Sequence, residues 1–327
     1  MKIIFDAMNC GLGNNGGSLT VIKSANALVN LGHDVTIVDT GKNQHTWTQL
    51  EAKHLIVKSV DEVPIADIVI ATGYHTVKTT LEMPEHCGLK AHWMRGWELW
   101  QMSEDEIIEK VLDVPTVKFV NSICLKDKLL EHGFDSYIVR PGYDFDELYN
   151  KDMVDDNIWL GGLYNTRHKT KRTDWVIDSA RILREQYGNV RLVMFGVNKN
   201  PNIEDIDFYL EQPKYSRKNV LYNIADIWLS ATELEGLHIV AAEAMLTKCP
   251  VVGTDTPMSG MQDYLIDNET GLVSRNNFNS FVECVETLML DIEKRKEFGK
   301  NAREKVLSLG SREDNMKKFV ELMESLC

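Results

Sequence analysis

The sequence lacks the features that mark membrane-spanning, secreted and disulfide-stabilised proteins. No segment approaches the ~18 apolar residues of a membrane span. The opening Met-Lys-Ile-Ile-Phe-Asp ends its apolar run too early for a secretory signal. The six cysteines are scattered, with no close pair at zinc or redox spacing: Cys10, Cys87, Cys124, Cys249, Cys284 and Cys327. We therefore expect a cytoplasmic protein with reduced thiols and no stable membrane insertion.

Positive charge is also scarce. The 327 residues include 36 Lys and Arg against 49 Asp and Glu, which gives a formal net charge of −13. Such a surface repels nucleic acid and anionic lipid, so a polyanionic ligand must be met by a local basic cluster. With 43% hydrophobic and 26% charged residues, the composition is that of an ordinary globular protein. Because single cores tend to split above ~250–300 residues, the length favours two domains.

The first half alternates strand-like and helix-like segments. Residues 2–7 read as a buried strand, and apolar residues then recur at helical spacing: Leu19, Ile22, Ala25 and Leu28. Further strand-like runs follow at 35–38, 67–71 and 116–120. This order predicts a parallel sheet with helices on its faces, forming one doubly wound domain over residues 1–150.

The second half repeats this alternation after a polar, acidic stretch at 150–157 that reads as a linker. Strand-like runs occur at 158–162, 190–196, 227–230 and 250–254. Helical patterns occur at 175–183, 278–309 and 312–326. We expect a second doubly wound domain over residues 151–309, followed by a terminal segment at 310–327.

A glycine-rich loop follows the first strand. Gly11, Gly13 and Gly16 have the spacing of the dinucleotide fingerprint, and Asp39 ends the next strand-like run, where a ribose-binding acid belongs. However, the first glycine comes several residues after the strand, whereas the fingerprint requires it at the turn itself. We favour a loop that faces an anion or a sugar, with Gly16 and Gly17 as donor-binding candidates. An NAD-dependent oxidoreductase and a purely structural turn remain alternatives.

Two acids, Glu235 and Glu243, flank a glycine in the most distinctive stretch of the chain, with seven residues between them. On one continuous helix they would be ~12 Å apart along the axis and roughly 80° apart in direction, too dispersed for one small ligand. If Gly236 keeps Glu235 on a loop and a helix begins near Leu237, both acids and the free N–H groups of residues 237–239 can meet one ligand. Carboxylates beside such amides suit a nucleotide sugar.

The ordered motifs of this half resemble those of the retaining glycosyltransferases of family four, which have the GT-B fold of two Rossmann-like domains. The motifs are Glu235-Gly-Leu-His, Glu243-Ala-Met, Lys248-Cys-Pro-Val-Val and Thr270-Gly-Leu-Val. Arg140-Pro-Gly-Tyr-Asp resembles the turn that closes the family's first domain, and Tyr222-Asn-Ile-Ala-Asp resembles the motif preceding its acidic pair. The resemblance covers nearly the whole chain and implies that the helix at 310–327 crosses back to the first domain.

The same resemblance implies roles for the acidic motif. Glu235 would contact hydroxyls of the donor sugar, and Glu243 would contact the ribose of the nucleotide. Leu237, His238 and Ile239 would offer backbone N–H donors. Without the resemblance, Glu235 reads as a solvated loop charge and Glu243 as an acid on a helix surface.

The leaving nucleoside diphosphate develops negative charge, so the site needs fixed cations or a metal. Arg167-His-Lys-Thr-Lys-Arg172 is the local basic cluster, placed after the first strand of the second half, where ligands meet such sheets. Gly162 stands where the family usually has an arginine, so Arg167 is the expected substitute, and Lys171 or Arg172 fills the family's lysine role. Which of Arg167, Lys169, Lys171 and Arg172 holds the diphosphate stays open, as does a simply solvated loop.

A metal is not expected. Asp144-Phe-Asp146 and Asp205-Ile-Asp207 match the short acidic motif by which other sugar transferases hold Mg²⁺ or Mn²⁺, but such pairs occur often by chance. The only co-substrate implied is a nucleotide-diphosphate sugar, with no further cofactor.

On the acceptor side, the run at 91–100 contains His92, Glu98 and three tryptophans, Trp93, Trp97 and Trp100. These tryptophans, with Arg95, could stack on and hydrogen-bond a ring-shaped acceptor, or they could belong to the core; His92 has the same two interpretations. By resemblance we favour His92 and Glu98 as catalytic candidates beside Glu235, Arg167 and Lys171.

These observations favour a metal-independent, retaining transfer of a sugar from a nucleotide-diphosphate donor to a glycan or other hydroxylated acceptor. A hydroxylated base in modified DNA is a minority option, which the net charge disfavours. A non-catalytic nucleotide-sugar binding protein and the oxidoreductase are alternatives of other classes. The donor, the acceptor and the oligomeric state are not readable from the sequence.

Overall fold

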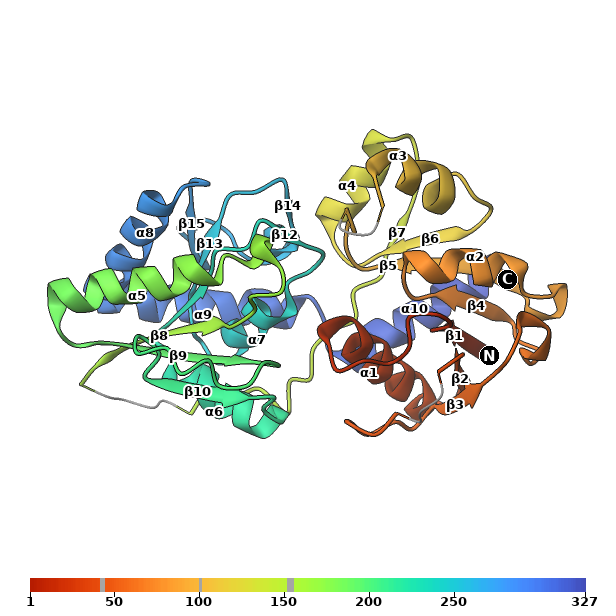
Figure 1. Cartoon of the computed structure of the whole chain (residues 1–327), viewed down its shortest axis with the longest axis horizontal. Helices are drawn as coiled ribbons and strands as arrows, with labels where there is room; N and C mark the ends of the chain where they lie inside the picture. Colours follow the sequence, from red (N-terminus) through yellow and green to blue (C-terminus); the bar gives the residue numbers. More distant parts are fainter. Residues whose placement is uncertain (42–44, 100–101, 152–155) are drawn as a thin grey trace. The chain divides into compact units, whose positions relative to one another are not determined.

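The computed structural model describes residues 1–41, 45–99, 102–151 and 156–327. The chain divides into two compact units (Figure 1). Unit 1 contains Met1–Gly142 together with Ser311–Cys327, and unit 2 contains Tyr143–Gly310. Both are built on parallel sheets with helices between successive strands, so the predicted α/β class with two doubly wound sheets is confirmed.

Unit 1 has a seven-stranded parallel sheet in the order β3-β2-β1-β4-β5-β6-β7. Its strands are β1 (Lys2–Asp6), β2 (Asp34–Asp39), β3 (Lys53–Ile56), β4 (Ile68–Ala71), β5 (Leu89–Met94), β6 (Val117–Val120) and β7 (Tyr137–Ile138). Its helices are α1 (Gly16–Asn30), α2 (Tyr74–Glu82), α3 (Glu104–Ile107), α4 (Ile123–Glu131) and α10 (Arg312–Leu326). It also has two short 3₁₀ helices, η1 (Val60–Glu62) and η2 (Glu85–Cys87), and a short π-helix, η3 (Ile108–Leu112).

The core of unit 1 joins the two ends of the chain. Phe5 of β1, Trp93 of β5 and Phe119 of β6 pack on Phe319 and Met323 of α10. This helix lies beside α1 (Figure 1). Burial of these large side chains stabilises the packing of α10 on this sheet, because each aromatic side chain removes ~150–250 Å² of surface from water.

Unit 2 has a six-stranded parallel sheet in the order β10-β9-β8-β11-β13-β15, and a small parallel pair, β12-β14. Its strands are β8 (Ile158–Leu163), β9 (Val190–Gly196), β10 (Phe208–Glu211), β11 (Ile227–Ser230), β12 (Leu234–Glu235), β13 (Val251–Thr254), β14 (Met258–Ser259) and β15 (Gly271–Ser274). Its helices are α5 (Thr173–Tyr187), α6 (Tyr215–Ile224), α7 (Ile239–Leu246), α8 (Phe278–Leu290) and α9 (Ile292–Ser308), with short turns η4 (Lys169–Lys171) and η5 (Gly260–Asp263).

Several sequence predictions need correction. The helical pattern at 278–309 is two helices, because the Asp291 carboxylate accepts a hydrogen bond from the Lys294 N–H and starts α9. Residues 91–94, expected as part of an acceptor-binding run, are the buried part of strand β5. Tyr149 and Lys151, at the start of the expected linker, donate backbone hydrogen bonds to Asn219 and Asn223 of α6 within unit 2. Residues 152–155 of that linker lie outside the described residues.

No helix in the described part of the chain combines the length and the apolar character that crossing a membrane requires.

Candidate functional site

The acidic motif of unit 2 forms a strand, a tight turn and a helix. Glu235 ends β12 and pairs with Ser259 of β14, and α7 begins at Ile239 rather than near Leu237 as predicted. His238 is the N-cap of α7 and has a left-handed backbone with φ 54°. A β-carbon added to Gly260 would lie 1.9 Å from the carbonyl oxygen of Gly236, so the two segments approach too closely for a side chain. No continuous helix joins the two acids.

Two basic side chains lie against Glu235. Lys171 Nζ forms an ion pair with Glu235 Oε1, and His238 Nδ1 lies 3.1 Å from the same oxygen. His238 Nε2 in turn lies 2.8 Å from Ser230 Oγ. Burial by itself would raise the pKa of Glu235, but the Lys171 ammonium and His238 outweigh that effect and hold the pKa well below its usual value. The carboxylate is therefore ionised and available as an acceptor at neutral pH.

Glu243 is buried in α7, with only 2% of its surface exposed, so the alternative interpretation as a surface acid is wrong. The hydroxyls of Tyr215 and Tyr222 donate to its two oxygens, the latter at 2.7 Å, and Lys218 Nζ lies 3.8 Å from Oε2. Burial, followed by the Glu243 charge, raises the pKa of Tyr222 well above its usual value, so this hydroxyl keeps its proton. Glu235 and Glu243 thus have separate partners, and their convergence on one ligand stays a prediction.

The three partners of Glu243 were not identified from the sequence. Tyr215, Lys218 and Tyr222 all lie on α6 at positions i, i+3 and i+7, which share one face of a helix. That spacing would have predicted that the three side chains face the same neighbour. Ser230, at the end of β11, offered no comparable pattern, because it meets His238 only through the fold.

The basic cluster is divided among different partners. Lys171 reaches Glu235, whereas Arg172 forms an ion pair with Glu233, donates to Asn276 at 2.6 Å and lies 4.2 Å from the ring centre of Trp175. Arg167 and Lys169 are exposed. The Glu233 N–H donates to the Thr170 carbonyl at 2.8 Å, which ties the basic loop to the acidic motif. Among the candidate cations, Lys171 is therefore the one that contacts Glu235.

Gly162 of β8 has no space for a side chain. A β-carbon there would lie 2.7 Å from Val176 Cγ1 of α5, which is closer than real contacts allow. A side chain at this position would require Val176 to move.

The glycine-rich loop of unit 1 leads into α1, which begins at Gly16 with Asn15 as its N-cap. The Arg95 guanidinium donates to the carbonyls of Gly17 and Thr72 and so fixes the loop to the end of β4. Strand β1 ends at Asp6, well before Gly11, so the glycine is not at the strand-to-helix turn that the dinucleotide fingerprint requires.

The acid at the end of β2, Asp39, already has protein partners. It accepts from the Gly41 N–H at 2.9 Å, and its Oδ2 lies 3.5 Å from His54 Nε2. The carboxylate expected to bind a ribose is therefore engaged within unit 1.

Of the two acceptor-side candidates, His92 is buried and Glu98 is half-buried. His92 is on β5 with only 1% of its surface exposed, and its Nε2 has no hydrogen-bond partner. Burial, with smaller effects from Arg95 and Lys118, lowers the pKa of His92 to about 3 and keeps the ring neutral. Burial raises the pKa of Glu98, opposed by Arg95. The Glu98 N–H donates to the Tyr74 hydroxyl at 3.3 Å.

The tryptophans next to these candidates serve the core. Trp93 is fully buried and donates to the Val139 carbonyl at 3.0 Å, so the idea that it stacks on an acceptor is wrong. Trp97 is buried and stacks on His132 with ring centres 5.8 Å apart. Trp100 lies outside the described residues.

The two short acidic motifs were the metal alternative. Asp205 and Asp207 form ion pairs with Arg181, Arg184 and Arg191. Within residues 1–41, 45–99, 102–151 and 156–327, no group of three His, Cys, Asp or Glu side chains is arranged to hold an ion.

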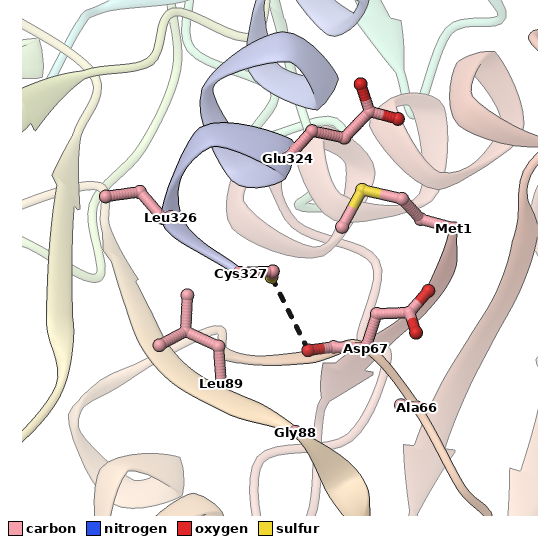
Figure 2. A pocket seen from close by; sticks show the side chains of 8 residues that line it. All are labelled: Met1, Ala66, Asp67, Gly88, Leu89, Glu324, Leu326 and Cys327. Atoms are coloured by element: carbon pink, nitrogen blue, oxygen red, sulfur yellow. Dashed lines mark hydrogen bonds between the residues drawn. The ribbon is translucent and has the colours of Figure 1, made fainter.

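A hollow of about 610 Å³ lies elsewhere on unit 1 (Figure 2). It is lined by Met1, Ala66, Asp67, Gly88, Leu89, Glu324, Leu326 and Cys327. Met1, Asp67 and Gly88 directly precede β1, β4 and β5, so the hollow is at the amino ends of the strands. Ligands of open α/β sheets bind at the carboxyl ends, where Asp39 and Arg95 lie. The hollow is therefore separate from the predicted site.

Comparison with known proteins places these features in context. Residues 163–305 match the protein family described as Glycosyl transferases group 1. The capsular polysaccharide biosynthesis glycosyltransferase CapM of Staphylococcus aureus is 28% identical over 171 residues, which are 49% of this chain and 44% of CapM. The aligned region thus spans less than half of that relative.

Two solved structures match over nearly their full length. Sucrose-phosphate synthase from Thermosynechococcus elongatus has a TM-score of 0.79 at 15% identity, covering 100% of this chain and 99% of that one. Anabaena HepE, solved with UDP-glucose, has a TM-score of 0.79 at 13% identity, covering 99% and 100%. These likenesses confirm the predicted GT-B fold class.

Proposed function

Because residues 163–305 form a Glycosyl transferases group 1 domain, we propose that this chain is a glycosyltransferase. It moves a sugar from a nucleotide-diphosphate donor to an acceptor hydroxyl, with retention of configuration and without a metal. Unit 2 binds the donor, and unit 1 supplies acceptor-binding groups. The observation that carries this proposal is the ionised Glu235 carboxylate, held beside a lysine at the start of α7.

Glu235 receives the hydroxyls of the donor sugar in this proposal. An ionised carboxylate accepts hydrogen bonds that are roughly twice as strong as neutral ones. Lys171, on the other side of the carboxylate, contributes positive charge close to where the sugar–phosphate bond breaks. This positive charge stabilises the transition state, because negative charge develops on the nucleoside diphosphate as it leaves.

The nucleotide part of the donor is assigned to the next turn of the chain. Glu243 accepts from the ribose hydroxyls, while the N–H groups of Leu237, His238 and Ile239 donate to phosphate oxygens at the positive end of α7. Arg167 supplies a further cation from the exposed part of the basic loop, and Arg172, already tied to Glu233, orders that loop. Gly16 and Gly17, at the start of α1 in unit 1, are further donor-binding candidates.

The acceptor is proposed to be a glycan. The name of CapM refers to capsular polysaccharide biosynthesis, which supports this substrate class. His92 and Glu98 are the acceptor-side candidates of unit 1. Burial lowers the pKa of His92 and keeps its ring neutral, and its Nε2 has no protein partner, so it can form a hydrogen bond with an acceptor hydroxyl but is a poor proton acceptor. The raised pKa of Glu98 suits a group that shares a proton. The net charge of −13 disfavours a DNA acceptor.

The experiment compares Glu235→Gln with the wild type on a panel of nucleotide sugars, measuring transfer and slow donor hydrolysis. Glu283→Gln, an exposed glutamate of α8, is the matched control. We expect Glu235→Gln to lose ~100-fold or more in kcat, because removing one preorganised group from a transition state costs on that order. Undiminished transfer by Glu235→Gln would refute the assigned role.

The finer claims need their own measurements. Full activity in EDTA supports metal independence, and an unchanged anomeric configuration in the product's proton NMR spectrum supports retention. Donor binding by calorimetry without turnover on any acceptor would identify a non-catalytic binding protein instead.

A further inference from the structure

His238 is held in a backbone conformation that suits glycine better than histidine. Its φ of 54° and ψ of 56° are in the left-handed region, where a β-carbon is disfavoured. The residue is nevertheless a histidine, with 8% of its surface exposed. Its ring makes no capping hydrogen bond to α7, although it occupies the N-cap position. A strained residue whose side chain does not serve the helix calls for another use of that side chain.

The neighbours of His238 fix its backbone and its ring separately. The Tyr264 hydroxyl donates to the His238 carbonyl at 2.6 Å, which holds the turn. Ser230 Oγ lies 2.8 Å from Nε2, which orients the ring. The remaining nitrogen, Nδ1, lies 3.1 Å from Glu235 Oε1.

Both basic partners of Glu235 approach the same oxygen. Lys171 Nζ and His238 Nδ1 contact Oε1, and neither ion pair involves Oε2. A carboxylate held through one oxygen cannot rotate freely about its last bond, so its other oxygen keeps a fixed direction.

We propose that His238 is a positioning residue for Glu235: with Lys171 it holds Oε1, so that Oε2 is presented to a hydroxyl of the donor sugar. This inference rests on the proposed function. The histidine ring positions Glu235, whereas the backbone N–H of the same residue donates to a phosphate oxygen. Ser230 contributes by fixing the ring.

The test replaces His238 with glycine, which relieves the backbone strain and removes the ring. Asn268→Gly is the matched control, because Asn268 also has a left-handed backbone, with φ 56°, but is exposed and belongs to another turn. We expect both variants to keep their melting temperatures within a few degrees of the wild type. Only His238→Gly should lose ~10- to 100-fold in kcat, as a misplaced catalytic contact does.

Three further measurements separate positioning from a structural role. Affinity for the nucleoside diphosphate alone should be unchanged in His238→Gly, because that ligand lacks the transferred sugar that Glu235 contacts. Added imidazole should restore part of the lost kcat. In a Glu235→Gln background, His238→Gly should cause no further loss, since the group it positions is already disabled.

The possible results decide between the claims. Native kcat in His238→Gly, with Glu235→Gln inactive, overturns the inference and leaves the proposed function intact. Full activity in Glu235→Gln refutes both. If His238→Gly melts far below Asn268→Gly, then His238→Asn, which tolerates the left-handed backbone, is used instead; native kcat in that variant, or weakened nucleoside diphosphate binding, also overturns the inference.

Discussion

Replacing Tyr222 with phenylalanine tests how Glu243 is kept in place. The Tyr222 hydroxyl is fully buried and donates to a carboxylate of which 2% is exposed. A hydrogen bond to a charged group contributes about 1.5–3 kcal/mol, and the loss is at the upper end when a buried partner is left without a donor. Phenylalanine keeps the ring packing on Phe195 and Trp228, so the change isolates the hydroxyl.

We expect Tyr222→Phe to lower the free energy of unfolding by about 2 kcal/mol, measured by urea denaturation. Donor affinity by calorimetry should fall as well, because Glu243 is then held by Tyr215 and Lys218 alone. Tyr187→Phe is the matched control, since the Tyr187 hydroxyl donates to Glu286 at 2.6 Å on the surface of unit 2. That change should have little effect. Equal losses of stability in the two variants would contradict the importance assigned to burial.

Two further predictions concern stability. Burial raises the pKa of Asp6 from 3.8 to about 6, so the folded chain keeps a proton that the unfolded chain releases, and unfolding free energy falls by about 3 kcal/mol as pH rises between these values. In Asp6→Asn, the free energy of unfolding from denaturation curves should no longer fall across this pH range. The same pH dependence in the variant and the wild type would contradict the role assigned to Asp6. Gly260→Ala should destabilise by at least ~1–3 kcal/mol, because the new β-carbon would meet the Gly236 carbonyl. Gly16→Ala, with no atom within 4 Å, is the control for stability, and equal melting temperatures would show that the close approach relaxes freely.

The sheets of both units were predictable because their central strands are continuous apolar runs. Residues 2–7, 67–71 and 227–230 correspond to β1, β4 and β11, which are buried on both faces. Strand β5 was missed because Lys90 and His92 interrupt its pattern. With polar residues at positions 90 and 92, the segment is not a continuous apolar run, which is the pattern that predicts a buried strand.

The candidate site was predictable in its parts and not in its contacts. The glycine at 236 indicated that Glu235 and α7 belong to different elements, which the structure shows. The pairing of Lys171 with Glu235 joins residues 64 positions apart, and it arises from the way neighbouring parallel strands end at one edge. The contacts of Glu243 could have been inferred from one spacing only, that of Tyr215, Lys218 and Tyr222 along one face of α6.

The placement of α10 has a consequence for biosynthesis. Unit 2 is one uninterrupted stretch, so it can fold as soon as Gly310 has left the ribosome. Unit 1 is translated first, yet its core stays open until Met316, Phe319 and Met323 have emerged. Until then, Trp93 and Phe119 lack their contacts with α10. Of the two units, the one whose synthesis begins first is therefore the last to complete its core.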